Sequence, residues 1–295
     1  MSIAIKKALG YALFLLVVGC FFLYIFFPTD SLRQYVEASM GKISPSLSLD
    51  VGRIRPALPF GIALEKVRLH HESEPRIPVF AGDTVTLFPS LRTLMERKPI
   101  VRFSCNTYGG NLDGRVVFRS FGLTEPLESH VRITDILLQE YGFLTESLKR
   151  QCTGVINGTV SYAFDKSDRL AGSGKADLSI SDGAVPFNQP LFGLEILDFE
   201  RLNARMELKE RQLVFEEISF RGKQLEARGN GTMRLDEMLG RSRLNLSIRV
   251  SPMPALWETA QDGFTVAQLF KQQPGSSPFN VRIYGTVAQP RIRLP

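Results

Sequence analysis

Hydrophobic and polar residues alternate with a period of two from about residue 47 to the C-terminal end of the chain. The alternation is strictest over 201–209 and 243–250. A period of two places successive side chains on opposite faces, so this pattern predicts half-buried β-strands. We expect further strands at 47–52, 62–69, 80–88, 100–107, 112–119, 129–133, 152–164, 169–180, 213–220, 224–235, 280–287 and 291–294.

The predicted fold class is mainly β, with a curved, mostly antiparallel sheet and one or two short helices. Glu210-Arg211-Gln212 joins two alternating runs, as in a hairpin. A break in the alternation near Glu65 and Lys66 suggests a bulge. Gly158, Gly231 and Gly285 each precede a Thr within an expected strand. Glycine in a strand permits a bend, so the repeated pair indicates curvature, unless it arose by chance.

The alternation also predicts which side chains share a face. A one-residue slip would move arginines and glutamates to the apolar side, so the register should be strongly held. The expected apolar inner face consists of Leu202, Met206, Leu208, Leu213, Phe215, Leu244, Leu246 and Ile248. This face is either packed shut as a core or left open as a groove.

Four segments outside the apolar N-terminal run predict helix or interrupt the strands. Over 135–149, apolar residues recur at helical spacing, and Thr134 or Asp135 could cap a helix there. A short amphipathic helix is expected over 31–40, and a helical turn over 89–98. The segment 252–270 breaks the alternation and contains Trp257, and a Pro- and Gly-rich loop follows at 274–278.

Residues 8–27 form an uncharged apolar run. About 20 helical residues cross a bilayer core, so the run predicts a transmembrane anchor. Lys6 and Lys7 precede it and favour a cytoplasmic N-terminus. A cleaved signal peptide would have a shorter apolar core and a small-residue cleavage site, and a lipoprotein signal at Val17 to Cys20 is the other alternative. The expected organisation is a tail over 1–7, the anchor, a juxtamembrane segment over 28–45 and a β-rich domain over 46–295, which could divide near 135–150.

Composition narrows the class of protein. With 44% hydrophobic and 22% charged residues, the part after the anchor can build a core. The net charge of +6 is spread along the chain, whereas a nucleic-acid-binding protein would cluster its basic residues. Cys105 and Cys152 could pair in an oxidising compartment or remain two buried thiols.

Candidate chemistry is sparse. The chain contains neither a Gly-x-Ser-x-Gly elbow nor a phosphate-binding loop of the Gly-x-x-x-x-Gly-Lys-Ser/Thr type. His70 and His71 are adjacent in an expected strand, so they point to opposite faces and cannot easily share a metal. Glu216 and Glu217 could form an acidic spot or a solvated strand edge. We therefore expect no enzyme activity, no catalytic residue, no cofactor and no metal.

The order of features resembles the long form of the type II secretion system protein N family. The residues that carry the resemblance are the short tail, the anchor and the ending Tyr284-Gly285-Thr286-Val287-Ala288-Gln289-Pro290-Arg291-Ile292-Arg293-Leu294. That ending, with Val85-Thr86-Leu87 and Leu91-Arg92-Thr93-Leu94, also resembles AsmA-like domains. The first resemblance implies a single-pass protein of the bacterial inner membrane with its C-terminal domain in the periplasm. The second implies a curved sheet with an apolar inner face.

Two functions follow as expectations. The first is a non-catalytic structural or adaptor subunit of the secretion apparatus, with partners on the secretin or pseudopilus side. The alternative is an AsmA-like protein that binds or transfers phospholipid between the inner and outer membranes. A continuous apolar groove would favour lipid handling, and a closed core with an exposed strand edge would favour contact with another protein by strand addition.

Overall fold

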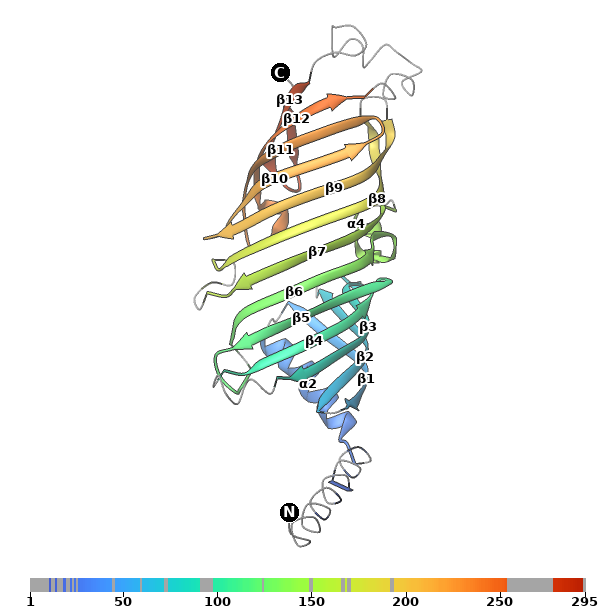
Figure 1. The fold of residues 1–295 in the computed structure, drawn as a ribbon, viewed down its shortest axis with the longest axis vertical. Coiled ribbons are helices and arrows are strands. Elements are labelled where there is room, and N and C mark those ends of the chain that lie inside the picture. The colour runs from blue at the N-terminus through green and yellow to red at the C-terminus, as the bar shows by residue number, and fades with distance from the viewer. Residues whose placement is uncertain are drawn as a thin grey trace, which may run out of the picture. The chain divides into compact units, whose positions relative to one another are not determined.

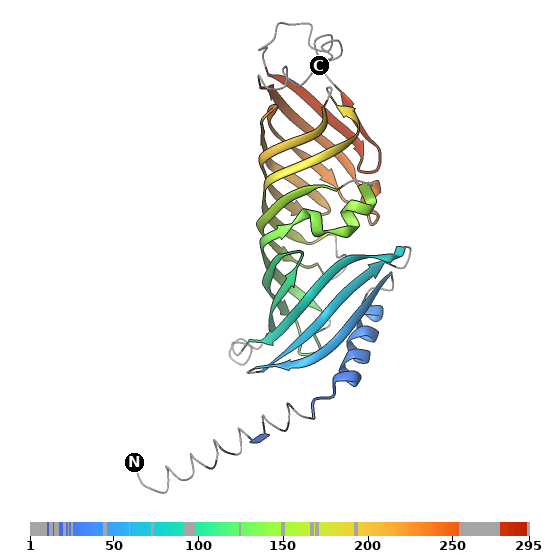
Figure 2. The same cartoon turned by 90° about the vertical axis from the view of Figure 1, so that its right-hand side faces the viewer.

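The computed structural model describes residues 26–43, 46–58, 60–71, 74–90, 98–123, 125–148, 151–165, 168, 171–191, 194–253 and 278–293, with isolated positions before residue 26. It divides into two units, residues 1–88 and 89–295. Each consists mainly of antiparallel strands (Figures 1 and 2). The predicted mainly-β antiparallel class is confirmed. Residues 135–150, where the sequence could divide, lie within the second unit.

The first unit is a helix packed on a short meander. Helix α2 (Thr29–Ile43) precedes strands β1 (Leu47–Ala57), β2 (Gly61–His71) and β3 (Glu74–Pro89), which pair in that order. The core is formed by Val51, Ile54, Leu64 and Val67. Leu32 and Val36 of α2 pack against it, as the amphipathic spacing of this helix predicts. The expected helix is therefore present and longer than 31–40.

An irregularity in the first unit lies where the sequence predicted a bulge. Lys66 has a φ of 54°, in the left-handed region. Val51 and Ile54 are both buried although they are three residues apart, as are Leu64 and Val67. The pairs Val51↔Val67 and Arg53↔Glu65 keep one register across this point. Both strands therefore kink together and turn an extra residue outward.

The second unit is a long meander, strongly twisted and curved (Figures 1 and 2). Its strands pair in chain order from β4 to β14. They are β4 (Ile100–Thr107), β5 (Gly110–Phe118), β6 (Pro126–Leu137), β7 (Thr153–Ala163), β8 (Ser173–Leu191), β9 (Leu194–Lys209), β10 (Gln212–Gly222), β11 (Leu225–Arg234), β12 (Arg243–Pro252), β13 (Phe279–Thr286) and β14 (Pro290–Arg293). A 3₁₀ turn, η2 (Leu239–Arg241), precedes β12.

The predicted hairpin after 201–209 is confirmed. Lys209 pairs with Gln212, so the turn consists of Glu210 and Arg211. These residues have φ values of 48° and 64°. Positive φ at both central positions gives a turn whose twist matches that of the flanking strands.

The long helix predicted over 135–149 is wrong. Asp135 to Leu137 end strand β6, followed by the 3₁₀ turn η1 (Leu138–Glu140) and the short helix α4 (Gly142–Leu148). Asp135 has a φ of 54° at a bulge between Ile133 and Ile136, and its N–H donates to the Asn157 side chain at 3.0 Å. Ile136 then pairs with Ile156 of β7. Pairing with β7 therefore overrides the helical spacing.

Several sequence predictions lie wholly or largely outside the described residues. They include most of the expected anchor over 8–27, the helical turn over 89–98, and the segment with Trp257. Among the residues that the structure does describe, no helix has both the length and the apolar character needed to cross a bilayer.

Candidate functional site

One face of the second-unit sheet is apolar across its strands. In antiparallel pairs, directly opposite residues lie on the same face, so the register traces rows across the sheet. The row through Met206 contains Phe103, Gly114, Val131, Val160, Ala176, Met206, Phe215, Gly231, Leu246, Ile283 and Ile292. The next row contains Cys105, Leu112, Ile133, Gly158, Leu178, Ala204, Ile218, Gly229, Ile248 and Val281.

Two further rows flank this pair. One contains Val101, Val116, Ser129, Tyr162, Gly174, Leu208, Leu213, Met233, Leu244, Gly285 and Pro290. The other contains Ile136, Ile156, Ile180, Leu202, Phe220, Ala227, Val250 and Phe279. We call the surface made by these four rows the apolar face.

The predicted inner-face residues all belong to the apolar face. Leu202 pairs with Phe220, Met206 with Phe215, and Leu208 with Leu213. Leu244, Leu246 and Ile248 lie in the same rows through β11. A bulge between Phe215 and Ile218 keeps both on this side and turns Glu216 and Glu217 away. The alternation therefore identified the correct face in β9, β10 and β12.

Sequence reasoning missed the extent of the apolar face. Its rows continue through β4 to β8, where Phe103, Val131 and Leu178 were not singled out. The alternation was present there, but glycines and the hydroxyl residues Ser129 and Tyr162 interrupt it. The distance from β4 to β14 is ten ladder spacings, about 48 Å along the sheet.

The described side chains of the apolar face are mostly not sealed from solvent. Most of its side chains are partly exposed, and buried members are confined to a few positions such as Ile136, Val250 and Val281. Helix α4 packs on η1 and, at seven residues, is about 10 Å long, so it is too short to cover a face of this length. Of the two alternatives, a closed core or an open groove, this partial exposure favours the open one.

Glycines in the strands allow the apolar face to curve. They also leave room for large neighbouring side chains to lie over the backbone. A Cβ on Gly114 would lie 2.7 Å from the ring of Phe103 and 2.4 Å from the carbonyl oxygen of His130. Gly285 has a φ of 105°. The Gly-Thr pairs noted in the sequence all place their glycine on the apolar face. They therefore support the predicted curvature.

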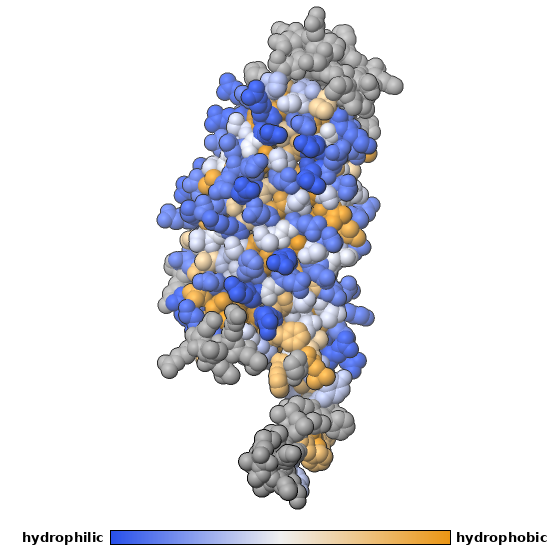
Figure 3. Space-filling model, in the orientation of Figure 1, coloured by the Kyte–Doolittle hydropathy of each residue, from blue (hydrophilic) through white to orange (hydrophobic). Residues whose placement is uncertain are grey.

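The opposite face is polar. Figure 3 shows hydrophilic residues over much of the second unit in this view. Arg205 links three strands, because its Nε lies 3.1 Å from Asp177 and its guanidinium 3.8 Å from Glu217. The hydrogen bond to Asp177 raises the pKa of Arg205. The hydrogen bond from Lys209, at 2.9 Å, lowers the pKa of Glu207.

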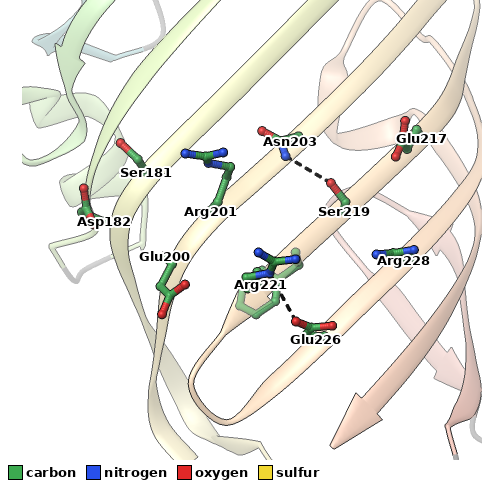
Figure 4. Close-up of a pocket in the computed structure, with 11 residues that line it drawn as sticks. Ser181, Asp182, Glu200, Arg201, Asn203, Glu217, Ser219, Arg221, Glu226 and Arg228 are labelled. Atoms are coloured by element: carbon green, nitrogen blue, oxygen red, sulfur yellow. Dashed lines mark hydrogen bonds and ion pairs between the residues drawn. The ribbon is translucent and has the colours of Figure 1, made fainter. Parts of the chain in front are cut away.

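A depression of about 620 Å³ lies on this polar face (Figure 4). Arg201 and Arg221 face each other across β9 and β10, and Arg221 pairs with Glu226 at 3.2 Å. Asn203 donates a hydrogen bond to Ser219 at 3.2 Å. The remaining charged lining residues are Asp182, Glu200, Glu217 and Arg228. Because cations and anions are nearly balanced, this depression has no clear preference for a charged ligand.

The other sequence candidates are not brought together. His70 and His71 lie next to each other in β2, in the first unit, and His130 lies opposite Arg115 and Ser161 on the polar face of the second unit. Within the described ranges, no group of His, Cys, Asp and Glu has the arrangement of a metal site.

Cys105 and Cys152 are separate buried thiols. Cys105 lies in β4, and Cys152 immediately precedes β7. Two strands lie between β4 and β7, so the two residues are about three ladder spacings, roughly 14 Å, apart across the sheet alone. Burial raises the pKa of Cys152. Of the two alternatives that the sequence left open, the structure has separate thiols.

Comparison with known proteins found no match: no family model, no curated protein and no solved structure is similar to this chain.

Proposed function

We propose that this protein is a non-catalytic lipid-binding protein whose apolar face holds the acyl chains of phospholipids. The observation that carries the proposal is the continuity of that face from β4 to β14 together with its partial exposure. A water-exposed apolar surface of this extent marks a binding site for an apolar partner. Each methylene buried against it would contribute about 0.8 kcal/mol.

The proposed setting is the inner membrane of a bacterium, with residues 8–27 as a single anchor and both units in the periplasm. This rests on the apolar run, the preceding lysines and the AsmA-like resemblance. A protein fixed in one membrane and carrying a long apolar face could shield acyl chains as they leave that membrane.

Leu246 is the position at which the proposal is best tested. It lies in the row between Gly231 and Ile283 and is partly exposed, so Leu246→Asp should leave the sheet folded while placing a charge among bound acyl chains. The matched control is Ser247→Asp, one residue along the same strand on the polar face. Both full-length variants would be purified from cells and extracted for lipid.

We expect co-purified phospholipid with the parent protein and with Ser247→Asp, and several-fold less with Leu246→Asp at unchanged circular dichroism. A parent protein that carries no lipid would overturn the proposal. Unfolding of Leu246→Asp alone would instead show that the face is a closed core.

The adaptor function in type II secretion is the second proposal. One observation favours it: strand β14 pairs with β13 on one side, and all four of its residues are exposed. Strand addition at that edge is disfavoured, however, because Pro290 lacks an N–H and Arg291 and Arg293 are charged. Retained contacts with a secretin or pseudopilus subunit in a lipid-free protein would rank this function first.

A further inference from the structure

The tip of the β1–β2 hairpin in the first unit is unusually apolar. Every residue from Pro56 to Leu64 is apolar or glycine. Leu58 is 74% exposed and Phe60 is 65% exposed. Hairpin tips in water are normally polar, since turn residues such as Asn, Asp and Ser bond to their own backbone. The exposure of two large apolar side chains here indicates a surface that contacts an apolar environment rather than water.

The packing of α2 places this tip at the end of the first unit at which α2 begins. Glu37 of α2 accepts a hydrogen bond from the Val51 N–H of β1 at 3.2 Å, and the helix ends shortly before β1 begins. Helix and strand are therefore antiparallel, so the start of α2 points toward the β1–β2 turn (Figure 2). Phe27, the last residue of the apolar run, packs against the same core.

Simple lengths show how far the tip extends. From Glu37 back to Thr29 the helix covers about 12 Å. From Val51 forward to Ala57 the strand covers about 20 Å. The tip of the hairpin thus extends past the start of α2, at the end of the unit where Phe27 packs.

Two arginines lie behind the apolar tip, where they could contact the headgroups of a bilayer. Arg53 and Arg55 are exposed on β1 behind the tip, and Arg55 also pairs with Glu65 at 2.5 Å. Arg55 is about 10 Å from Leu58 along the strand. Apolar side chains that sink about 5–10 Å below the headgroups would leave these guanidinium groups near the phosphates.

We infer that the tip of the β1–β2 hairpin inserts into the lipid bilayer beside the anchor. Leu58 and Phe60 enter the acyl region, and Arg53 and Arg55 contact anionic headgroups. This rests on the proposed anchor but not on lipid binding by the apolar face. It gives the first unit two attachments to one membrane surface, which would fix the orientation of α2 and β1 relative to the bilayer.

The experiment uses full-length protein in vesicles of phosphatidylcholine and phosphatidylglycerol, with Trp257→Phe to remove the natural indole. Phe60→Trp places an indole at the tip. Ser48→Trp, on β1 at the opposite end and also exposed, is the matched control. The readouts are flotation with the vesicles and quenching of the emission by lipids brominated in the acyl chain.

We expect both variants to float, with emission from Phe60→Trp shifted to the blue and quenched about twofold, as at an interfacial depth. Emission from Ser48→Trp should be unaffected. Flotation without quenching of Phe60→Trp would overturn the insertion alone, and would leave a partner protein or a second copy as the occupant of the tip. Failure of both variants to float would overturn the anchor and, with it, this inference.

Discussion

Gly114 shows how a single residue controls the shape of the apolar face. The ring of Phe103 and the carbonyl oxygen of His130 occupy the space that a side chain would need. Large side chains can therefore lie flat across the strand instead of standing on it.

Gly114→Val should destabilise the second unit by about 1–3 kcal/mol, because the added atoms meet backbone that cannot move aside. Gly142→Ala is the control, since a Cβ there meets nothing within 4 Å. Urea denaturation measures both. Equal midpoints for the two variants would show that the close approach at Gly114 is unimportant.

The cysteines make a second residue-scale prediction. A disulfide needs Cα atoms within about 7 Å, and two strands separate these residues. Protein carrying Cys20→Ala, unfolded without reductant, should therefore take up two alkyl groups by mass spectrometry. Uptake of none would mean that Cys105 and Cys152 are bonded.

The raised pKa of Cys152 gives this site a pH dependence. Burial favours the neutral thiol, so its contribution to stability is complete below the unfolded pKa of about 8.5 and is lost as the pH rises through the folded pKa. Cys152→Ala should flatten the loss of thermal stability above pH 8.5 relative to the parent protein. An unchanged alkaline profile would assign that loss to other groups.

Among the elements, the turns at one end of the second unit are tied together by Arg211. Its guanidinium pairs with Asp168, in the β7–β8 connection, and lies 4.0 Å from Glu237, after β11. Its carbonyl oxygen accepts from the Leu235 N–H at 2.7 Å. The bond to Asp168 raises the pKa of Arg211.

Arg211→Ala should lower the melting temperature and increase amide exchange in all three connections, because one side chain serves them together. Lys209→Ala removes a cation two residues away that pairs with Glu207 on its own strand, and should have a smaller effect. Loss of protection confined to the β9–β10 turn would contradict the linking role.

An element could be predicted well where the residues that determine its structure are close to one another in the sequence. Strands β9, β10 and β12 alternate strictly, and a two-residue turn joins the first pair, so their faces and register follow from the sequence. The end of β6 could not be predicted, since Ile136, Leu137 and Tyr141 have helical spacing and the decisive contact, Ile136 with Ile156, is twenty residues away. In β8, Pro186 concealed a strand that continues to Leu191.

The sequence predicted the apolar character of the candidate site but not how many strands it spans. The sequence indicated an apolar side made by β9, β10 and β12. It could not say whether that side was covered, because covering depends on where η1 and α4 lie. The exposed tip at Leu58 and Phe60 was also missed, although the uninterrupted apolar residues between Arg55 and Glu65 were visible in the sequence.

At the scale of the whole molecule, the proposed anchor sets the topology. An enzyme that is active only in the cytoplasm should be silent when it is fused to the C-terminus of this protein, because in the proposed topology Lys6 and Lys7 hold the N-terminus inside and the rest of the chain is exported. Replacing residues 8–27 with a cleavable signal peptide serves as the control and should make the protein extractable from membranes without detergent. An active fusion would reverse the topology.

The strand order of the second unit has a consequence for how such a protein can change over time. Every described strand of this unit pairs with the strands that precede and follow it in chain order. Stability in such an architecture is close to a sum of contributions from adjacent strands. Loss or duplication of one hairpin would therefore shorten or lengthen the sheet by about 10 Å without disturbing the remaining pairs. The reach of the apolar face is thus a quantity that can be adjusted in whole hairpins, by natural variation or by deliberate deletion.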